Sequence, residues 1–152
     1  MKWFKKRFKR SWYVPIIRLD GVIGSSGQFG GGGLTDHSLA SVLEKAFEMP
    51  RIKAVALIVN SPGGSPTQSS LIAARIKRLS KINKVPVIAF CEDVAASGGY
   101  WLACSADEIF ADENSIVGSI GVISASFGFH EFMNRQGIER RIYTAGEDKS
   151  VL

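Results

Sequence analysis

The chain has 152 residues, of which 45% are apolar and 22% charged, a composition typical of one globular domain rather than a disordered or membrane-embedded protein. Its formal net charge is +5, but six positive charges fall within the first ten residues, which contain no acid. The other 13 basic residues are balanced by 14 acidic ones, so the body of the chain offers no basic groove and we expect no nucleic-acid partner.

The N-terminal tail, residues 1–12, interleaves these cations with Trp3, Phe4, Phe8 and Trp12. Cations mixed with large aromatic rings favour the surface of an anionic membrane, although a solvated basic tail fits equally well. No apolar region of a secretory signal peptide follows the charges, and no stretch approaches the roughly 20 apolar residues of a transmembrane helix. We therefore expect a cytoplasmic protein, peripheral on the inner face of the plasma membrane where the tail binds lipid.

The main domain, residues 13–152, begins with strand signals at 14–19 and 22–23. A glycine-rich stretch follows at residues 24–33. It lacks the lysine of a phosphate-binding P-loop and is not held tightly between a strand and a helix. We interpret it as a mobile loop or lid.

An amphipathic helix is predicted next, from a cap at Thr35 or Asp36 to about Met49, and Pro50 ends it. Residues 54–59 then form a continuous apolar run rich in β-branched side chains. Such a run is typical of a strand that is buried on both faces.

The rest of the chain continues this alternation. We predict helices at 67–82 and 127–136, and strands at 85–90, 108–111, 117–123 and 140–144. Repeated strand–helix–strand units favour an α/β fold with a mostly parallel sheet, in which sites form at the carboxyl ends of the strands. Gly63-Gly64 and Ser97 each follow a predicted strand, so we expect these two turns to open on the same edge of the sheet.

Ser97 lies among small residues within 94–101, between the end of a strand and the start of a helix. A serine is a useful nucleophile only where it is approachable and paired with a base. The N–H of Gly98, and a second N–H from the Gly63-Gly64 pair, are candidates for stabilising an oxyanion. These residues alone also allow two other interpretations. Ser97 also fits a helix N-cap, and the glycine pair fits a phosphate cradle, although no cation lies near it in the sequence.

The general base is not identified by spacing. His130 lies 33 residues beyond Ser97 on an aromatic helix, where a structural role is favoured. A lysine serves as a base where burial depresses its pKa, but the chain holds many lysines. His37 and His130 are far apart, and Cys91 and Cys104 are interpreted as buried, reduced thiols. We therefore expect no metal and no cofactor.

Four ordered motifs carry a resemblance to a known family: residues 60–64 (NSPGG), 94–100 (VAASGGY), 118–122 (GSIGV) and 144–149 (TAGEDK). Together they resemble the signal peptide peptidase A family of serine–lysine peptidases, from about Val14 to the last residue. The resemblance implies the Clp protease/crotonase-like fold, with a mostly parallel sheet and crossover helices. The family continues well beyond the last of these motifs, so we expect a peptidase domain that is incomplete at the C-terminus.

By this resemblance Ser97 is the nucleophile and Lys149 the general base. Gly64 and Gly98 supply the oxyanion donors, and Ser119 hydrogen-bonds and orients the lysine amine. The resemblance implies a serine endopeptidase that cleaves small apolar peptides, such as remnant signal peptides, and that forms a homo-oligomer.

Three alternatives remain beside this hypothesis. A Clp-type Ser-His-Asp peptidase has its histidine at the position that Val122 occupies here, and a crotonase-type acyl-CoA enzyme needs no serine nucleophile. The alternative from outside the enzymes is an inactive interaction module of the same fold, which docks on a membrane surface or on an active homologue.

Overall fold

The computed structural model describes residues 11–24, 32–123, 125–141, 143 and 145. The tail up to Arg10, most of the predicted glycine-rich loop and Lys149 lie outside the described residues. The chain divides into two compact units, residues 1–122 and 123–152, and each is described by itself.

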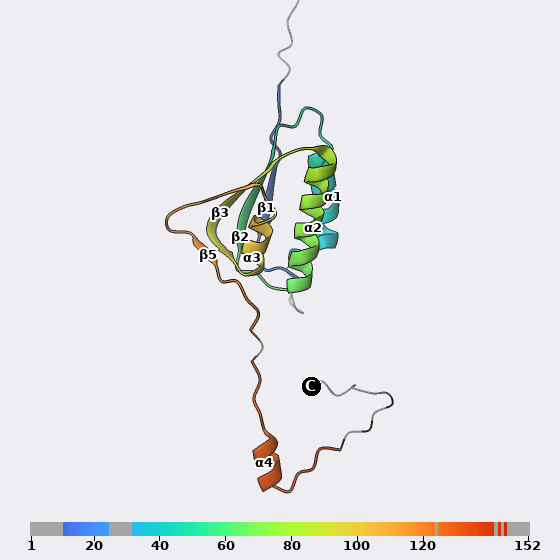
Figure 1. Cartoon of the computed structure of the whole chain (residues 1–152), viewed down its shortest axis with the longest axis vertical. Coiled ribbons are helices and arrows are strands. Elements are labelled where there is room, and N and C mark those ends of the chain that lie inside the picture. Colours follow the sequence, from blue (N-terminus) through green and yellow to red (C-terminus); the bar gives the residue numbers. More distant parts are fainter. Residues whose placement is uncertain (1–10, 25–31, 124, 142, 144, 146–152) are drawn as a thin grey trace, which may run out of the picture. The chain divides into compact units, whose positions relative to one another are not determined.

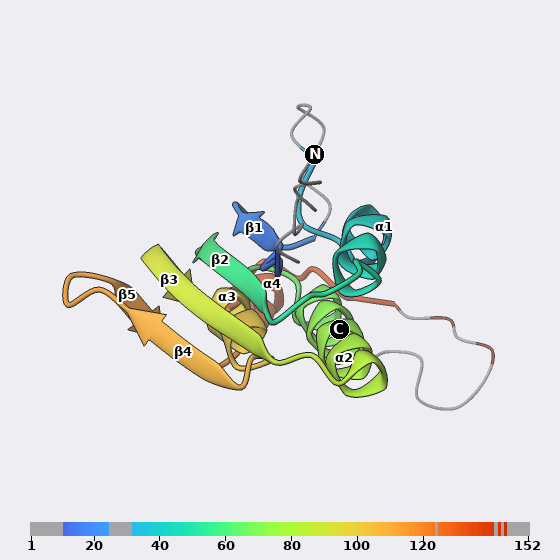
Figure 2. The same cartoon turned by 90° about the horizontal axis from the view of Figure 1, so that it is seen from above.

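The first unit is built on a parallel sheet. Its strands are β1 (Ile16–Asp20), β2 (Val55–Ser61), β3 (Val87–Ala96), β4 (Glu108–Ala111) and β5 (Ile116–Gly118). Figure 1 shows β1, β2 and β3 next to one another. The first four strands lie in the order β1-β2-β3-β4, and β5 pairs with the far end of β3, beyond the stretch that β4 covers (Figure 2). Every pairing is parallel, which confirms the predicted α/β class.

Three helices pack on this sheet. α1 (Asp36–Phe47) and α2 (Pro66–Asn83) lie side by side on one face, as Figure 2 shows, and the short α3 (Gly98–Ala103) contacts β2, β3 and α2. The apolar side chains that point to this face are buried, among them Leu57 and Val59 of β2. Removing this surface from water is the main force that holds the helices on the sheet.

Local signals explain where the two long helices begin. Thr35 and Ser38 form a capping box, in which each hydroxyl accepts the backbone N–H of the other at 3.1 Å. At the second helix the Ser65 hydroxyl accepts from the N–H of Gln68, and proline fills the first helical position. The predicted starts of both helices are therefore confirmed to within one residue.

Four predicted elements differ clearly from the structure. β3 runs to Ala96 instead of ending at residue 90, so the sheet itself leads directly into Ser97. β5 ends at Gly118 because the next residue, Ser119, has a φ of 53°, in the left-handed region, and cannot continue the strand. In the second unit α4 spans only His130–Arg135, and the described residues of the predicted strand 140–144 form no strand.

Candidate active site

Ser97 has an unusual backbone conformation. It joins the last residue of β3 to the first residue of α3 with φ 52° and ψ −118°. A side chain at positive φ costs about 1–3 kcal/mol, and such strain persists only where the surroundings impose it. Here the Ser97 N–H donates to the carbonyl of Gly118 at 2.7 Å, and the Ser97 carbonyl accepts from the N–H of Trp101 at 3.0 Å. Both ends of the turn are thereby fixed.

The Ser97 hydroxyl does not cap the helix that follows it. No side-chain cap hydrogen bond is formed at α3, and the hydroxyl has no hydrogen-bond partner anywhere in the described part of the chain. Ser97 therefore occupies the N-cap position of α3, as that alternative has it, but its side chain does not act as a cap. The strained turn instead presents a half-buried serine whose hydroxyl is available for chemistry.

The turn after β2 contacts the turn after β3, as the sequence predicted. A β-carbon on Gly63 would lie 2.9 Å from the Cβ of Ser97 and 2.8 Å from the backbone nitrogen of Gly98. Real Cβ atoms do not approach other atoms so closely, so only glycine fits at position 63. Gly63 and Gly64 also have φ angles of 98° and 146°, which side chains rarely adopt.

Beside Ser97, two backbone N–H groups have no acceptor among the described residues. Gly98 is the first residue of α3, so its N–H has no intrahelical partner. Around Gly64, Ile23 hydrogen-bonds the carbonyl of Gly63 and the N–H of Ser65, each at 2.8 Å. The N–H of Gly64 itself has no acceptor among the described residues. The arrangement provides two donors for a negatively charged oxygen.

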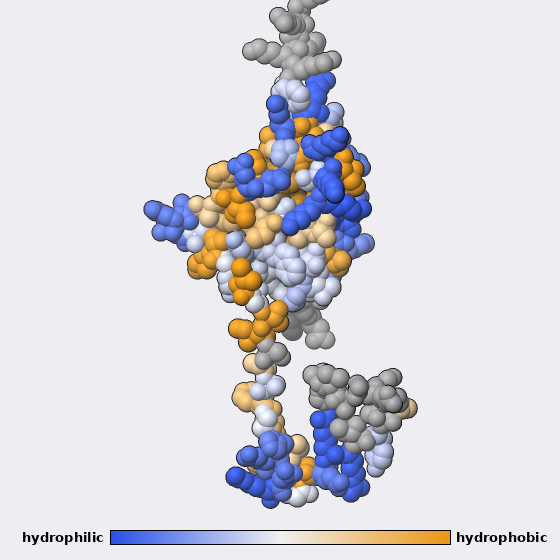
Figure 3. Space-filling model, viewed as in Figure 1, coloured by the Kyte–Doolittle hydropathy of each residue, from blue (hydrophilic) through white to orange (hydrophobic). Residues whose placement is uncertain are grey.

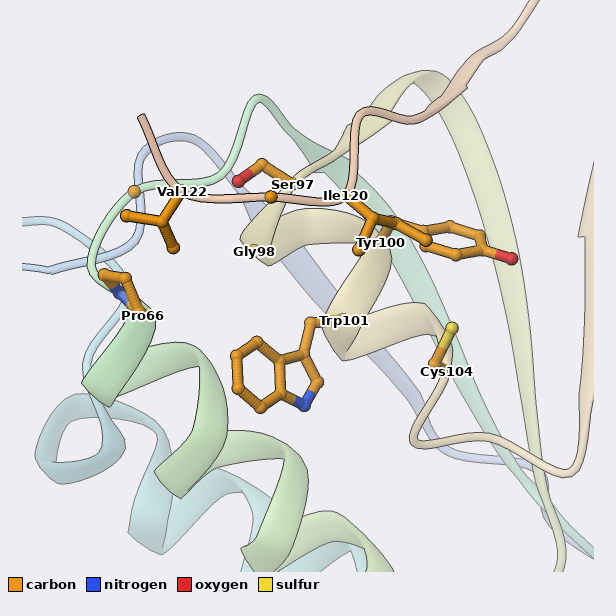
Figure 4. A pocket seen from close by; sticks show the side chains of 10 residues that line it. Pro66, Ser97, Gly98, Tyr100, Trp101, Cys104, Ile120 and Val122 are labelled. Atoms are coloured by element: carbon orange, nitrogen blue, oxygen red, sulfur yellow. The ribbon is translucent and has the colours of Figure 1, made fainter. Parts of the chain in front are cut away.

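A cavity of about 320 Å³ opens next to Ser97 and is lined by Gly64 and Gly98 as well. Its other walls come mainly from Pro66, Tyr100, Trp101, Cys104, Ile120 and Val122. Figure 4 shows the segment from Ile120 to Val122 running past Ser97, with Pro66 and Trp101 across the cavity from it. These walls are predominantly apolar, so the cavity suits an uncharged hydrophobic group.

The hydrophobic character continues on the surface around this segment. Ile116, Ile120 and Val122 are among the most exposed large apolar residues of the first unit. In Figure 3 hydrophobic residues gather over β5 and the chain that follows it. The approach to Ser97 therefore runs over apolar surface.

The two cysteines differ in environment. Cys91 is buried, and desolvation raises the pKa of its thiol. Cys104 is half-buried and lines the cavity, and the neighbouring thiol raises the pKa of the Tyr100 hydroxyl. Both thiols are free. The prediction of a buried thiol is confirmed for Cys91 and wrong for Cys104, because the short α3 ends with Cys104 facing the cavity.

The remaining predicted site residues are placed only in part. Ser119 is exposed and directly follows Gly118, the residue that is hydrogen-bonded to Ser97. Lys149, its expected partner, lies outside the described residues. Val122, at the position of the Clp histidine, lines the cavity with an apolar side chain that cannot act as a base. Within the described ranges, no three histidine, cysteine or acidic residues are grouped so that they could hold a metal.

The sequence did not indicate the cavity walls. Ile120 and Val122 belong to a motif that was selected for its serine and glycines, Trp101 directly follows another, and neither helical nor strand periodicity marks the three residues. Ser61 and Ile23, which hold the glycine turn, were also missed. Ser61 lies inside the NSPGG motif and Ile23 lies just before the glycine-rich stretch, but neither pattern indicates that the residue holds the turn.

The chain is similar in sequence to a known family of peptidases. The family model described as Peptidase family S49 matches residues 80–152, which include the positions of Ser97, Ser119 and Lys149. A "Protease 4" of Haemophilus influenzae is 40% identical over 82% of the chain. A "Putative signal peptide peptidase SppA" of Enterococcus faecium is 31% identical over 91% of it.

Another relative carries a different name. A protein of Brucella melitensis named "Na(+)/H(+) antiporter NhaA" is 52% identical over 91% of this chain, which covers 19% of that protein. The chain likewise covers 20% of the Haemophilus protein and 41% of the Enterococcus protein, so it spans less than half the length of each. No helix among the described residues is long and apolar enough to cross a membrane.

A solved structure has the same fold. It is a mutant of the 1510-N membrane-bound stomatin-specific protease, with a TM-score of 0.57 and 20% sequence identity. The likeness covers 74% of this chain and 49% of that one. At this level of identity it shows a common fold.

Proposed function

Because the chain belongs to peptidase family S49, the signal peptide peptidase A family, we propose that it is a serine endopeptidase in which Ser97 is the nucleophile and Lys149 the general base. One observation carries the proposal. Ser97 is held in a strained turn with its hydroxyl unbonded in the described part of the chain, against Gly63 and at the edge of an apolar cavity.

The proposed reaction is acyl transfer through an acyl-enzyme. The Ser97 Oγ attacks the peptide carbonyl carbon while the neutral amine of Lys149 takes the hydroxyl proton. The carbonyl oxygen becomes an oxyanion, which accepts hydrogen bonds from the N–H groups of Gly64 and Gly98. The lysine then protonates the leaving amine, and water hydrolyses the ester. Ser119 is proposed to accept a hydrogen bond from the lysine amine and orient it.

The cavity supports a preference for apolar substrates. Since its walls carry no charged side chain, a charged substrate group would be desolvated there without a partner. A small apolar side chain next to the scissile bond would be buried against Trp101 and Val122. Remnant signal peptides, which are short and hydrophobic, are substrates of this chemical class.

We also propose that the N-terminal tail attaches the protein to the inner face of the plasma membrane. Trp12 is 62% exposed, and the Lys53 ammonium lies 4.8 Å from the centroid of its ring. Trp12 and Lys53 therefore combine an aromatic ring with a cation, as residues 1–10 do in the sequence, and this combination favours an anionic membrane surface.

Cleavage of a short apolar peptide tests the catalytic assignment. We expect Ser97→Ala and Lys149→Ala to abolish cleavage, and Lys77→Ala, which changes an exposed lysine of α2, to retain it. A folded wild-type protein that cleaves none of a panel of apolar peptides would contradict the proposal and support the inactive interaction module.

A further inference from the structure

Ser61, the last residue of β2, joins two turns through its hydroxyl. The side chain is 0% exposed. Its Oγ donates to the carbonyl of Gly21 at 2.6 Å and accepts the N–H of Gly63 at 3.2 Å. Both hydrogen-bonding capacities are therefore used within the protein, and the hydroxyl ties the turn after β1 to the glycine turn after β2.

The same glycine turn is held from its other side by Ile23. The Ile23 N–H donates to the carbonyl of Gly63, and the Ile23 carbonyl accepts from the N–H of Ser65, each at 2.8 Å. The segment from Gly21 to Ile23 thus forms three hydrogen bonds around the Gly63-Gly64 turn, one of them through Ser61. These hydrogen bonds fix the direction of the Gly64 N–H.

Ser61 also contacts the helix that carries the other donor. A β-carbon on Gly99 would lie 2.4 Å from the carbonyl oxygen of Ser61 and 3.1 Å from its Cβ. The first turn of α3 therefore packs directly on Ser61. One buried residue therefore contacts both backbone segments that line the cavity, those of Gly64 and Gly98.

We infer that Ser61 is a positioning residue that holds the Gly63-Gly64 turn in register with Gly98, so that both N–H groups meet one oxyanion. This inference rests on the proposed function. Ser61 does not line the cavity, so it acts through Gly63 and not on the substrate. Its loss leaves the buried Gly63 N–H without its acceptor and removes the link to the Gly21 carbonyl, and the turn relaxes.

A comparison of two buried serines separates this role from a general effect on folding. Ser105 is 5% exposed, and its hydroxyl donates to the carbonyl of Leu102 at 2.6 Å, away from the glycine turn. We expect Ser61→Ala to lower kcat about tenfold or more with KM nearly unchanged, because the oxyanion exists only in the transition state. Ser105→Ala should lose thermal stability while kcat per folded molecule stays at the wild-type value.

Amide hydrogen exchange gives a readout that does not depend on activity. Exchange of the Gly63 N–H should be faster in Ser61→Ala than in wild type and unchanged in Ser105→Ala. Ser61→Cys fills the space that alanine would leave, with a slightly larger atom, and weakens the hydrogen bonds, so it replaces the alanine variant if that variant does not fold.

The outcomes separate this inference from the proposed function. A folded Ser61→Ala protein with wild-type kcat, or with a loss confined to KM, overturns the positioning role. If the Gly63 N–H exchanges at the wild-type rate in that variant, the Ser61 hydroxyl does not hold the glycine turn, and the positioning role is wrong. Absence of Ser97-dependent cleavage in the wild-type protein refutes the proposed function, and the catalytic meaning of Ser61 with it.

Discussion

Gly63 and Ser97 lie so close together that a β-carbon on Gly63 would come within 2.9 Å of the Ser97 Cβ. The two residues are 34 positions apart in the sequence and meet because β2 and β3 are adjacent parallel strands that end at the same edge. Their contact brings a strained serine and a side-chain-free turn together. The proposed oxyanion site depends on this contact.

Gly63→Ala should inactivate the protein. The added methyl group would collide with Ser97 and with the Gly98 nitrogen, and displacing a reacting group by about 1 Å lowers the rate about a hundredfold. Gly137→Ala is the control, because Gly137 also has a positive φ, of 65°, but has open space around it. Cleavage kinetics of folded protein check the prediction, and equal activity of the two variants would contradict it.

Cys104 should react with a maleimide and Cys91 should not. Cys104 lines the cavity beside Ser97, whereas Cys91 is buried with a raised thiol pKa that disfavours the reactive thiolate. The bulky adduct would fill the cavity and block cleavage. Peptide mapping identifies the modified residue. The Cys104→Ala variant should keep its peptide-cleaving activity in the presence of the maleimide. If the maleimide inactivates this variant, modification of Cys104 is not what blocks cleavage, and the cavity is not where the substrate binds.

The ion pair between α1 and α2 should make stability depend on pH. Arg75 donates hydrogen bonds to both carboxylate oxygens of Asp36 at 2.7 Å, which lowers the pKa of Asp36 from its usual value. A lowered folded-state pKa gives a stabilisation that is present above the unfolded pKa and lost as pH falls through the folded one. Both side chains are partly exposed, so we expect about 1 kcal/mol near neutral pH.

Chemical denaturation of Asp36→Asn tests this sign. The difference in unfolding free energy from wild type should shrink as pH falls from about 5 to about 2. Glu139→Gln, which removes the exposed pair with Arg141, should show little difference at any pH. A constant difference for Asp36→Asn would show that the carboxylate charge is not what stabilises the helix pair.

Removal of residues 1–12 should weaken binding to anionic vesicles. The tail supplies six cations, and Trp12 is exposed beside Lys53. Flotation with vesicles that contain phosphatidylserine should recover the intact protein and lose it at high salt, whereas neutral vesicles should recover little. Equal flotation of the protein with and without the tail would contradict the proposal that residues 1–12 attach the protein to a membrane.

Much of the fold could be predicted because buried parallel strands and capped helices leave strong local signals. The apolar run of β2, the Thr35 cap and the proline at the start of α2 placed their elements within a few residues. The likeness to a solved protease confirms the Clp protease/crotonase-like fold. β3 was predicted too short because Glu92 and Asp93 interrupt its apolar pattern, although pairing with β5 continues the strand beyond them.

Less of the candidate active site than of the fold could be predicted from the sequence. Small residues and strand ends indicated that Ser97 and the Gly63-Gly64 turn would meet, but not that Ser97 has a positive φ, which the pairing with Gly118 imposes. Ser61 carries no periodic signal, since its role arises from contacts to Gly21 and Gly99 that are distant in the sequence. The role of Lys149 and the homo-oligomer stay predictions.

The central claim is that Ser97 is the nucleophile, and covalent labelling tests it most directly. The protein is treated with a serine-reactive fluorophosphonate, and the modified residue is located by mass spectrometry. We expect a single adduct on the peptide that contains Ser97, absent from the folded Ser97→Ala protein and competed by an apolar peptide. Undiminished labelling of Ser97→Ala, or an adduct on another serine, would contradict the assignment.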